Sequence, residues 1–145
     1  MGYLKASVFA IAATVAGVST AIAADETKVN EMIVCAVTEI HACELYQGCR
    51  ELKPSETNAP DFMKINLKKM ELTGRRYDGT YATLQIASKT RLPKLLLLQG
   101  INAEPEELAD GLAYNMAIHV DTGRMAASVA STETVYSLLG TCHAL

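Results

Sequence analysis

The chain is poor in aromatic residues, and its basic residues are outnumbered by acidic ones. It has no tryptophan and two phenylalanines among 145 residues, so a core must be built from Leu, Ile, Val, Met and Tyr. Its 13 basic side chains compare with 16 acidic ones, and the densest basic stretch, residues 64–76, is interrupted by Glu71. Nucleic-acid-binding domains usually present a clustered basic face. The composition therefore predicts no nucleic-acid partner.

Sequence signatures of catalysis are also missing. There is no Gly-x-Ser-x-Gly elbow, no phosphate-binding loop and no dinucleotide fingerprint. The triplet Asp121-Thr122-Gly123 resembles the active-site triplet of aspartic proteases, but Arg124 follows it where that family has a small residue, and no second triplet occurs. The same triplet is common in turns for conformational reasons. The sequence thus predicts no catalytic residues.

The three histidines do not form a metal-binding pattern. His41 lies two residues before Cys43, and His143 follows Cys142, but these spacings differ from those of closed zinc sites. Leu139 stands where a covalent haem motif would need its first cysteine. Cysteines joined in disulfides also offer no thiolate ligand. We therefore expect neither a metal nor another cofactor.

The N-terminus has the organisation of a cleavable export signal. Lys5 supplies a positive charge, residues 6–21 are uncharged and mostly apolar, and Ala21-Ile22-Ala23 provides the small residues that signal peptidase requires. The run is rich in small residues and short for a stable membrane span. We expect residues 1–23 to be removed, with Ala24 as the alternative cleavage point. The product would be one soluble domain, residues 24–145, without a membrane anchor, in the periplasm or secreted.

Four cysteines lie in the predicted mature part, and an even number in an exported chain predicts two disulfides. The sequence allows three pairings. We favour Cys43–Cys49, because Gly48 can adopt the positive φ that a tight reversal needs. Cys35–Cys142 then joins the first strand to the last. On the chain-entropy model the longer loop gives the larger stabilisation.

Short apolar segments separated by turn residues predict a mainly β domain. Residues 114–120 and 124–129 alternate and should form a hairpin, with Gly123 in a left-handed conformation. Residues 135–141 fit a last strand better than a helix, residues 52–60 read as a loop, and residues 103–110 could form one short helix. Further strands are expected at residues 32–37, buried on both faces, and at 62–72, 81–88 and 95–99. Six or seven strands indicate a small antiparallel barrel or sandwich.

A set of short segments resembles a group of small exported proteins of Gram-negative bacteria to which no activity is assigned. The segments are Cys35, Cys43, Gly48-Cys49, Pro60-Asp61-Phe62, Leu98-Gln99-Gly100, Thr122-Gly123-Arg124-Met125 and Gly140-Thr141-Cys142. The resemblance spans nearly the whole mature chain and implies an all-β fold and a periplasmic location. Periplasmic lysozyme inhibitors are similar in format only, since their Ser-Gly-x-x-Tyr stretch has no counterpart here.

These observations favour a non-catalytic module that binds a protein, an envelope component or a small ligand. Such a module would bind through an exposed apolar patch or a barrel mouth, for which Tyr114 and Tyr136 are the candidate contacts. The alternative is a small periplasmic hydrolase or thiol oxidoreductase whose site is assembled only in three dimensions. The sequence leaves the oligomeric state and the identity of the partner open.

Overall fold

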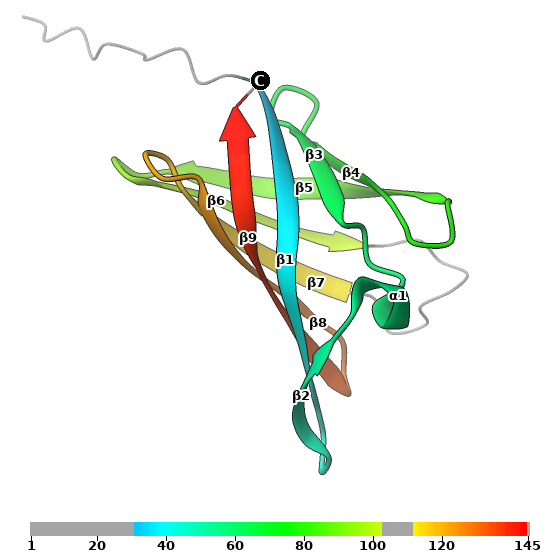
Figure 1. The fold of residues 1–145 in the computed structure, drawn as a ribbon. Helices are drawn as coiled ribbons and strands as arrows, with labels where there is room; N and C mark the ends of the chain where they lie inside the picture. Colours follow the sequence, from blue (N-terminus) through cyan, green and yellow to red (C-terminus); the bar gives the residue numbers. More distant parts are fainter. Residues whose placement is uncertain (1–30, 103–111, 145) are drawn as a thin grey trace, which may run out of the picture.

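The computed structural model describes residues 31–102 and 112–144, which are mainly β, as the sequence predicts (Figure 1). The predicted signal segment and the possible helix at residues 103–110 lie outside the described residues. The described part contains one short helix, α1 (Pro54–Thr57), and nine strands rather than six or seven. The strands are β1 (Met32–Glu44), β2 (Gly48–Leu52), β3 (Phe62–Asn66), β4 (Glu71–Arg75), β5 (Tyr81–Arg91), β6 (Leu95–Asn102), β7 (Leu112–His119), β8 (Arg124–Ala130) and β9 (Thr134–Ala144).

Two local features account for the additional strands. Residues 62–72, expected to be one strand, form β3 and part of β4, because the chain reverses at a turn in which Met70 has a φ of 56°. The side chain of Asn66 caps this turn by accepting hydrogen bonds from the backbone N–H groups of Lys68 and Lys69. Residues 48–52 form β2, which pairs with the second half of β1. The expected loop at residues 52–60 contains α1 instead.

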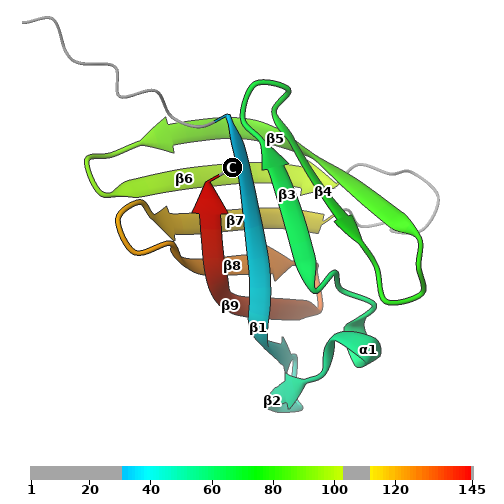
Figure 2. The ribbon, with the colours of Figure 1, turned by 45° about the horizontal axis from the view of Figure 1, so that its top comes forward.

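The sheet closes on itself into a barrel. Strand order runs β1-β3-β4-β5-β6-β7-β8-β9, and β9 pairs with β1 to complete eight antiparallel strands. β2 is an extra strand beside β1, and Figures 1 and 2 show it with α1 at one end of the barrel. The long β1 makes this possible, because its first half pairs with β3 and its second half with β2.

Side chains fill the inside of the barrel in two clusters. Burial alternates along the strands, including β1, which the sequence had suggested would be buried on both faces. The second cluster consists of Ile40, Ala42 and Leu52, at the end of the barrel where α1 lies. The main cluster contains Ile33, Cys35, Met63, Ile65, Leu67, Leu72, Ile86, Leu96, Leu98, Tyr114, Met116, Ile118, Met125 and Cys142.

Two disulfides tie the strands together, in the pairs expected from the sequence. Cys35 and Cys142 are register partners in the ladder that closes the barrel, with Cα atoms 3.9 Å apart. Cys43 and Cys49 join β1 to β2 across a turn in which Gly48 has a φ of 83°. Two disulfides are consistent with an oxidising compartment. Among the described residues, no helix has the length and apolarity needed to span a bilayer.

Candidate functional site

A pocket of about 310 Å³ opens at the end of the barrel beside α1. We call it the mouth pocket. One wall comes from side chains of β1, β7, β8, β9 and the β8–β9 turn, and the other comes from α1 and the residues that follow it. Its lining consists of Ile40, Thr57, Ala59, Leu112, Val129, Ser131, Thr134, Tyr136 and Leu138.

The mouth pocket is apolar because it lies where the two core clusters meet. Val129 packs against the main cluster, whereas Ala59 and Tyr136 pack against the second one, to which Ile40 belongs. The side chains of the two clusters leave a gap between them at this end of the barrel. The gap is bounded mainly by aliphatic groups and one aromatic ring, which is the usual composition of a small-molecule site.

The polar groups around the mouth pocket are mostly engaged locally. The Thr57 hydroxyl donates to the Pro54 carbonyl and accepts from the Ala59 N–H. The Ser131 hydroxyl donates to the Thr134 carbonyl and accepts from the backbone N–H groups of the same turn. Within the described residues, no hydrogen bond involves the phenolic hydroxyl of half-buried Tyr136. This hydroxyl is therefore available to a bound molecule.

The α1 segment is held over the barrel end by a tie to the β4–β5 turn. Asn58 donates from Nδ2 to Asp78 Oδ2 over 2.7 Å and accepts from the Asp78 backbone N–H over 3.0 Å. The hydroxyl and backbone N–H of Thr80, together with the Asn58 amide, lower the pKa of Asp78 to about 2. Asp78 is thus ionised, as the acceptor role requires. This pair fixes one wall of the mouth pocket.

The two tyrosines predicted as ligand contacts occupy different environments. Tyr136 lines the mouth pocket. Tyr114 is 4% exposed, and its hydroxyl donates to the Gln85 carbonyl over 2.9 Å. Burial raises the pKa of Tyr114 to about 12. Both residues share one row of the inner face, because Tyr114 pairs with Val129 and Val129 pairs with Tyr136. The structure therefore gives Tyr114 a place in the core near the site, and Tyr136 a place in its wall.

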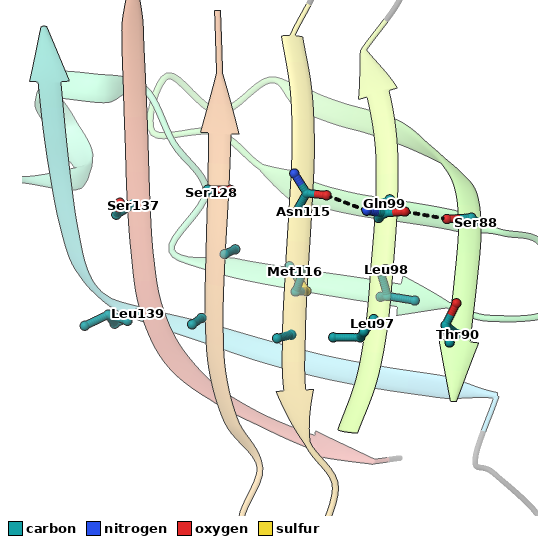
Figure 3. Close-up of a pocket in the computed structure, with 13 residues that line it drawn as sticks. Ser88, Thr90, Leu97, Leu98, Gln99, Asn115, Met116, Ser128, Ser137 and Leu139 are labelled. Carbon is teal, nitrogen blue, oxygen red and sulfur yellow. Dashed lines mark hydrogen bonds between the residues drawn. The ribbon is translucent and has the colours of Figure 1, made fainter. Parts of the chain in front are cut away.

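A second, larger depression of about 450 Å³ lies on the outer face of β5 to β9 (Figure 3). A row of polar side chains crosses it, since consecutive strands place Ser88, Gln99, Asn115, Ser128 and Ser137 opposite one another. Ser88 Oγ donates to Gln99 Oε1, and Gln99 Nε2 donates to Asn115 Oδ1, over 3.0 and 2.8 Å. Among the described residues, the side chains that line this depression are all uncharged.

The remaining sequence candidates for chemistry have structural roles. The Asp121-Thr122-Gly123 triplet forms the β7–β8 turn, where Gly123 has a φ of 70° and its N–H donates to the His119 carbonyl. All four cysteines are in disulfides. His41 lies 3.7 Å from the Glu39 carboxylate on β1. No group of three or more potential metal ligands occurs within residues 31–102 and 112–144.

Sequence reasoning missed most of the mouth pocket. The alternating pattern predicts that Val129 points inward. The pattern does not show that a pocket lies beside this side chain. The sequence predicts a loop around Thr57 and Ala59, and nothing in their local sequence indicates that this segment covers the barrel end.

No protein-family model matches the chain, and comparisons with curated proteins and with solved structures likewise found no significant similarity.

Proposed function

We propose that this protein is a non-catalytic binding module that holds a small apolar ligand in the mouth pocket. The observation that carries the proposal is the apolar gap between the two core clusters, walled by the barrel on one side and by the α1 segment on the other. Small barrels use such mouths for ligands, since the strands supply a rigid wall and the connecting segments supply a variable one.

The mouth pocket suits a small ligand better than the outer depression does. A ligand in the outer depression would contact only one face of a sheet, so most of its surface would stay in water. In the mouth pocket a ligand touches both walls and loses more apolar surface to the protein. Burial of apolar surface contributes about 25 cal/mol per Å², so the more enclosed site gives the higher affinity.

The lining also limits the chemistry of the ligand. None of the nine lining residues is charged at neutral pH, so the pocket favours an uncharged molecule. The free hydroxyl of Tyr136 can make one hydrogen bond, which would orient a carbonyl or hydroxyl group of the ligand. The described lining consists of aliphatic side chains, hydroxyl groups and one phenol, which support binding rather than hydrolysis or redox chemistry.

The proposal includes the location predicted from the N-terminus. An export signal at residues 1–23, cleaved near Ala23 or Ala24, would deliver the domain to the periplasm or beyond. The two disulfides support this, because an oxidising compartment is where such bonds persist. The ligand would then be a molecule of the envelope or of the surroundings of the cell.

Two matched substitutions of alanine by leucine test where the ligand binds. Ala59→Leu adds three carbons to the half-buried side chain in the wall of the mouth pocket, and Ala126→Leu adds the same three carbons in the outer depression. Binding is followed through the fluorescence of N-phenyl-1-naphthylamine, an uncharged apolar probe. Folding of both variants is checked by circular dichroism and thermal unfolding.

The proposal predicts that the wild type and Ala126→Leu bind the probe with the same affinity, whereas Ala59→Leu binds it at least tenfold more weakly. Tyr136→Phe should retain most of the affinity for this probe, because the probe makes little use of the hydroxyl. Equal binding by wild type and Ala59→Leu, or loss of binding in Ala126→Leu, would contradict the assignment to the mouth pocket.

A further inference from the structure

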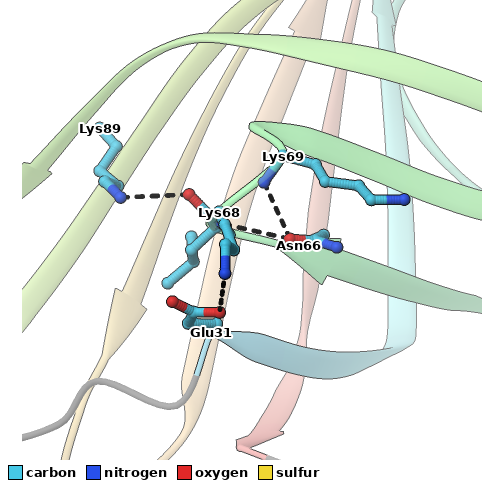
Figure 4. A network of polar contacts seen from close by, with 6 residues as sticks. Glu31, Asn66, Lys68, Lys69 and Lys89 are labelled. Atoms are coloured by element: carbon cyan, nitrogen blue, oxygen red, sulfur yellow. Dashed lines mark hydrogen bonds and ion pairs between the residues drawn. The ribbon is translucent and has the colours of Figure 1, made fainter.

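The opposite end of the barrel also has a pocket of about 310 Å³, but its rim is charged. Figure 4 shows three of its charged side chains, those of Glu31, Lys68 and Lys89. We call it the basic pocket. Leu67 and Leu96, which are almost fully buried, are its apolar members. Its polar members are Glu31, Lys68, Lys89 and Arg91. Three cationic groups and one carboxylate therefore surround an apolar floor.

A β-bulge in β5 turns two of these cations toward the pocket. The register between β5 and β6 shifts between Ile86 and Ser88, so the alternation of β5 changes phase there. After the bulge, Lys89 pairs with Leu98 and Arg91 pairs with Leu96. Paired residues lie on the same face of a sheet, and both leucines face the core.

Without the bulge, Ser88 and Thr90 would occupy the inner-face positions of β5 and the two cations would point outward. Bulges at barrel rims commonly re-aim side chains next to functional sites. Lys89 and Arg91 lie at the rim, where their side chains remain exposed to solvent. The bulge thus brings positive charge to the barrel end, where an anion could compensate it.

Only part of this positive charge is compensated within the described residues. Lys89 Nζ donates to the Leu67 carbonyl over 3.1 Å, which fixes the ammonium group across the opening without neutralising it. Lys68 Nζ lies 3.9 Å from Glu31 Oε2. Among the described residues, no ion pair or side-chain hydrogen bond involves Arg91. The rim carries three positive charges and one negative charge, although the whole chain has a net charge of −3.

We propose that the basic pocket is a second binding site, which takes an anionic amphiphile by its carboxylate or phosphate group. The guanidinium of Arg91 can bind such a group through two parallel hydrogen bonds, and the ammonium of Lys89 adds a further charge-assisted bond. The apolar part of the ligand lies against Leu67 and Leu96. This site is distinct from the mouth pocket in both position and charge.

Calorimetric titration with octyl phosphate tests the proposal, with inorganic phosphate as the head group alone. The titrations use the Ala59→Leu protein, so that octyl phosphate does not occupy the mouth pocket. They are repeated with the wild-type protein. Arg91→Gln and Lys89→Gln remove the two charges aimed at the pocket. Lys64→Gln, an exposed position on β3 outside the pocket, removes the same charge elsewhere.

Arg91→Gln is expected to weaken octyl phosphate binding about tenfold, since a hydrogen bond to a charged group makes a contribution of that size. Lys89→Gln should act in the same direction, Lys64→Gln should have no effect, and inorganic phosphate should bind at least tenfold more weakly than octyl phosphate. The proposal is overturned if Arg91→Gln and Lys89→Gln both bind octyl phosphate as tightly as the protein that keeps Arg91 and Lys89. It is also overturned if inorganic phosphate binds as tightly as octyl phosphate. If the mouth pocket binds no ligand, the ratios of octyl phosphate affinity between these variants stay the same, so the two proposals are tested separately.

Discussion

The ring of Tyr114 on β7 lies directly over Gly100 on β6. A Cβ atom at position 100 would come within 2.5 Å of the Tyr114 ring, and it would also clash with the carbonyl oxygen of Gln85 on β5. The ring therefore fills the space left by the missing side chain, and its hydroxyl reaches over Gly100 to bond that same carbonyl. One aromatic residue thus links three strands, in the inner row that continues to the mouth pocket.

Titration of Tyr114 should reveal this environment. Because burial raises its pKa from 10.0 to about 12 in the folded state, the neutral form is favoured by folding. The resulting contribution to stability is complete below pH 10 and is lost as pH rises toward 12, by up to about 1.4 kcal/mol per pH unit. Absorbance at the phenolate wavelength should show one tyrosine ionising near pH 12.

Tyr114→Phe serves as the control for that titration. It should remove the step near pH 12 and make the free energy of unfolding less dependent on pH between 10 and 12. It should also cost about 1 kcal/mol at neutral pH, because the Gln85 carbonyl loses its donor. Persistence of the step in Tyr114→Phe would assign it to another residue.

Gly100→Ala should destabilise the barrel although alanine is the smallest possible change. The added Cβ meets the Tyr114 ring and the Gln85 backbone at once, and the backbone cannot move aside as a flexible side chain could. Overpacking of this kind costs about 1–3 kcal/mol. Urea denaturation measures the loss, with Ser137→Ala on the exposed face of β9 as a substitution expected to be neutral. Equal midpoints for the two variants would refute the packing argument.

The sequence predicted those parts of the fold that depend on local pattern. Alternation and Gly123 indicate the β7–β8 hairpin, and a strand at residues 135–141 is favoured over a helix because it places Cys142 beside Cys35. The sequence does not distinguish a barrel from a sandwich, because closure of the sheet depends on the β1–β9 ladder, which joins residues about 100 positions apart. The expected Cys35–Cys142 disulfide brings the first and last strands together, but no local pattern shows that they pair along their length and close the sheet.

The features that form the two pockets were hidden for similar reasons. The buried positions change phase at the β3–β4 turn, from Ile65 and Leu67 to Leu72, but no glycine or proline marks the reversal. The bulge in β5 inverts that period without a proline or glycine to mark it. Residue type alone suggests Tyr114 and Tyr136 as ligand contacts, and it does not reveal that Tyr136 lines the mouth pocket whereas Tyr114 lies in the core.

The tie between Asn58 and Asp78 should control both stability and ligand binding. Asn58 has a φ of 51°, so Ala at this position adds left-handed backbone strain to the loss of the amide, whereas Gly removes the amide without that strain. Asn58→Ala should therefore be about 1–2 kcal/mol less stable than Asn58→Gly in urea denaturation. Both variants should bind the naphthylamine probe more weakly than wild type. Wild-type affinity in both would show that the tie does not position the pocket wall.

The two disulfides should differ in accessibility and in their contribution to stability. Cys35 and Cys142 are 0% and 3% exposed, whereas Cys49 is exposed, so a mild phosphine should reduce Cys43–Cys49 first. Replacing the Cys35–Cys142 pair by alanines should cost about 4–5 kcal/mol, against about 2 kcal/mol for the other pair, because the loops differ in length. Alkylation and peptide mapping give the order of reduction. Simultaneous reduction of both bonds would contradict the expected order.

The location of a bound apolar ligand is the central claim, and backbone amide chemical shifts measure it most directly. During titration of the ¹⁵N-labelled protein with 1-octanol, the account predicts saturable shifts at Ile40, Ala59 and Leu138, around the mouth pocket. The amides of Ser88, Gln99 and Asn115 serve as reporters of the outer depression and should move little. Saturable shifts confined to those outer residues, or no saturable shift at either place, would contradict the account.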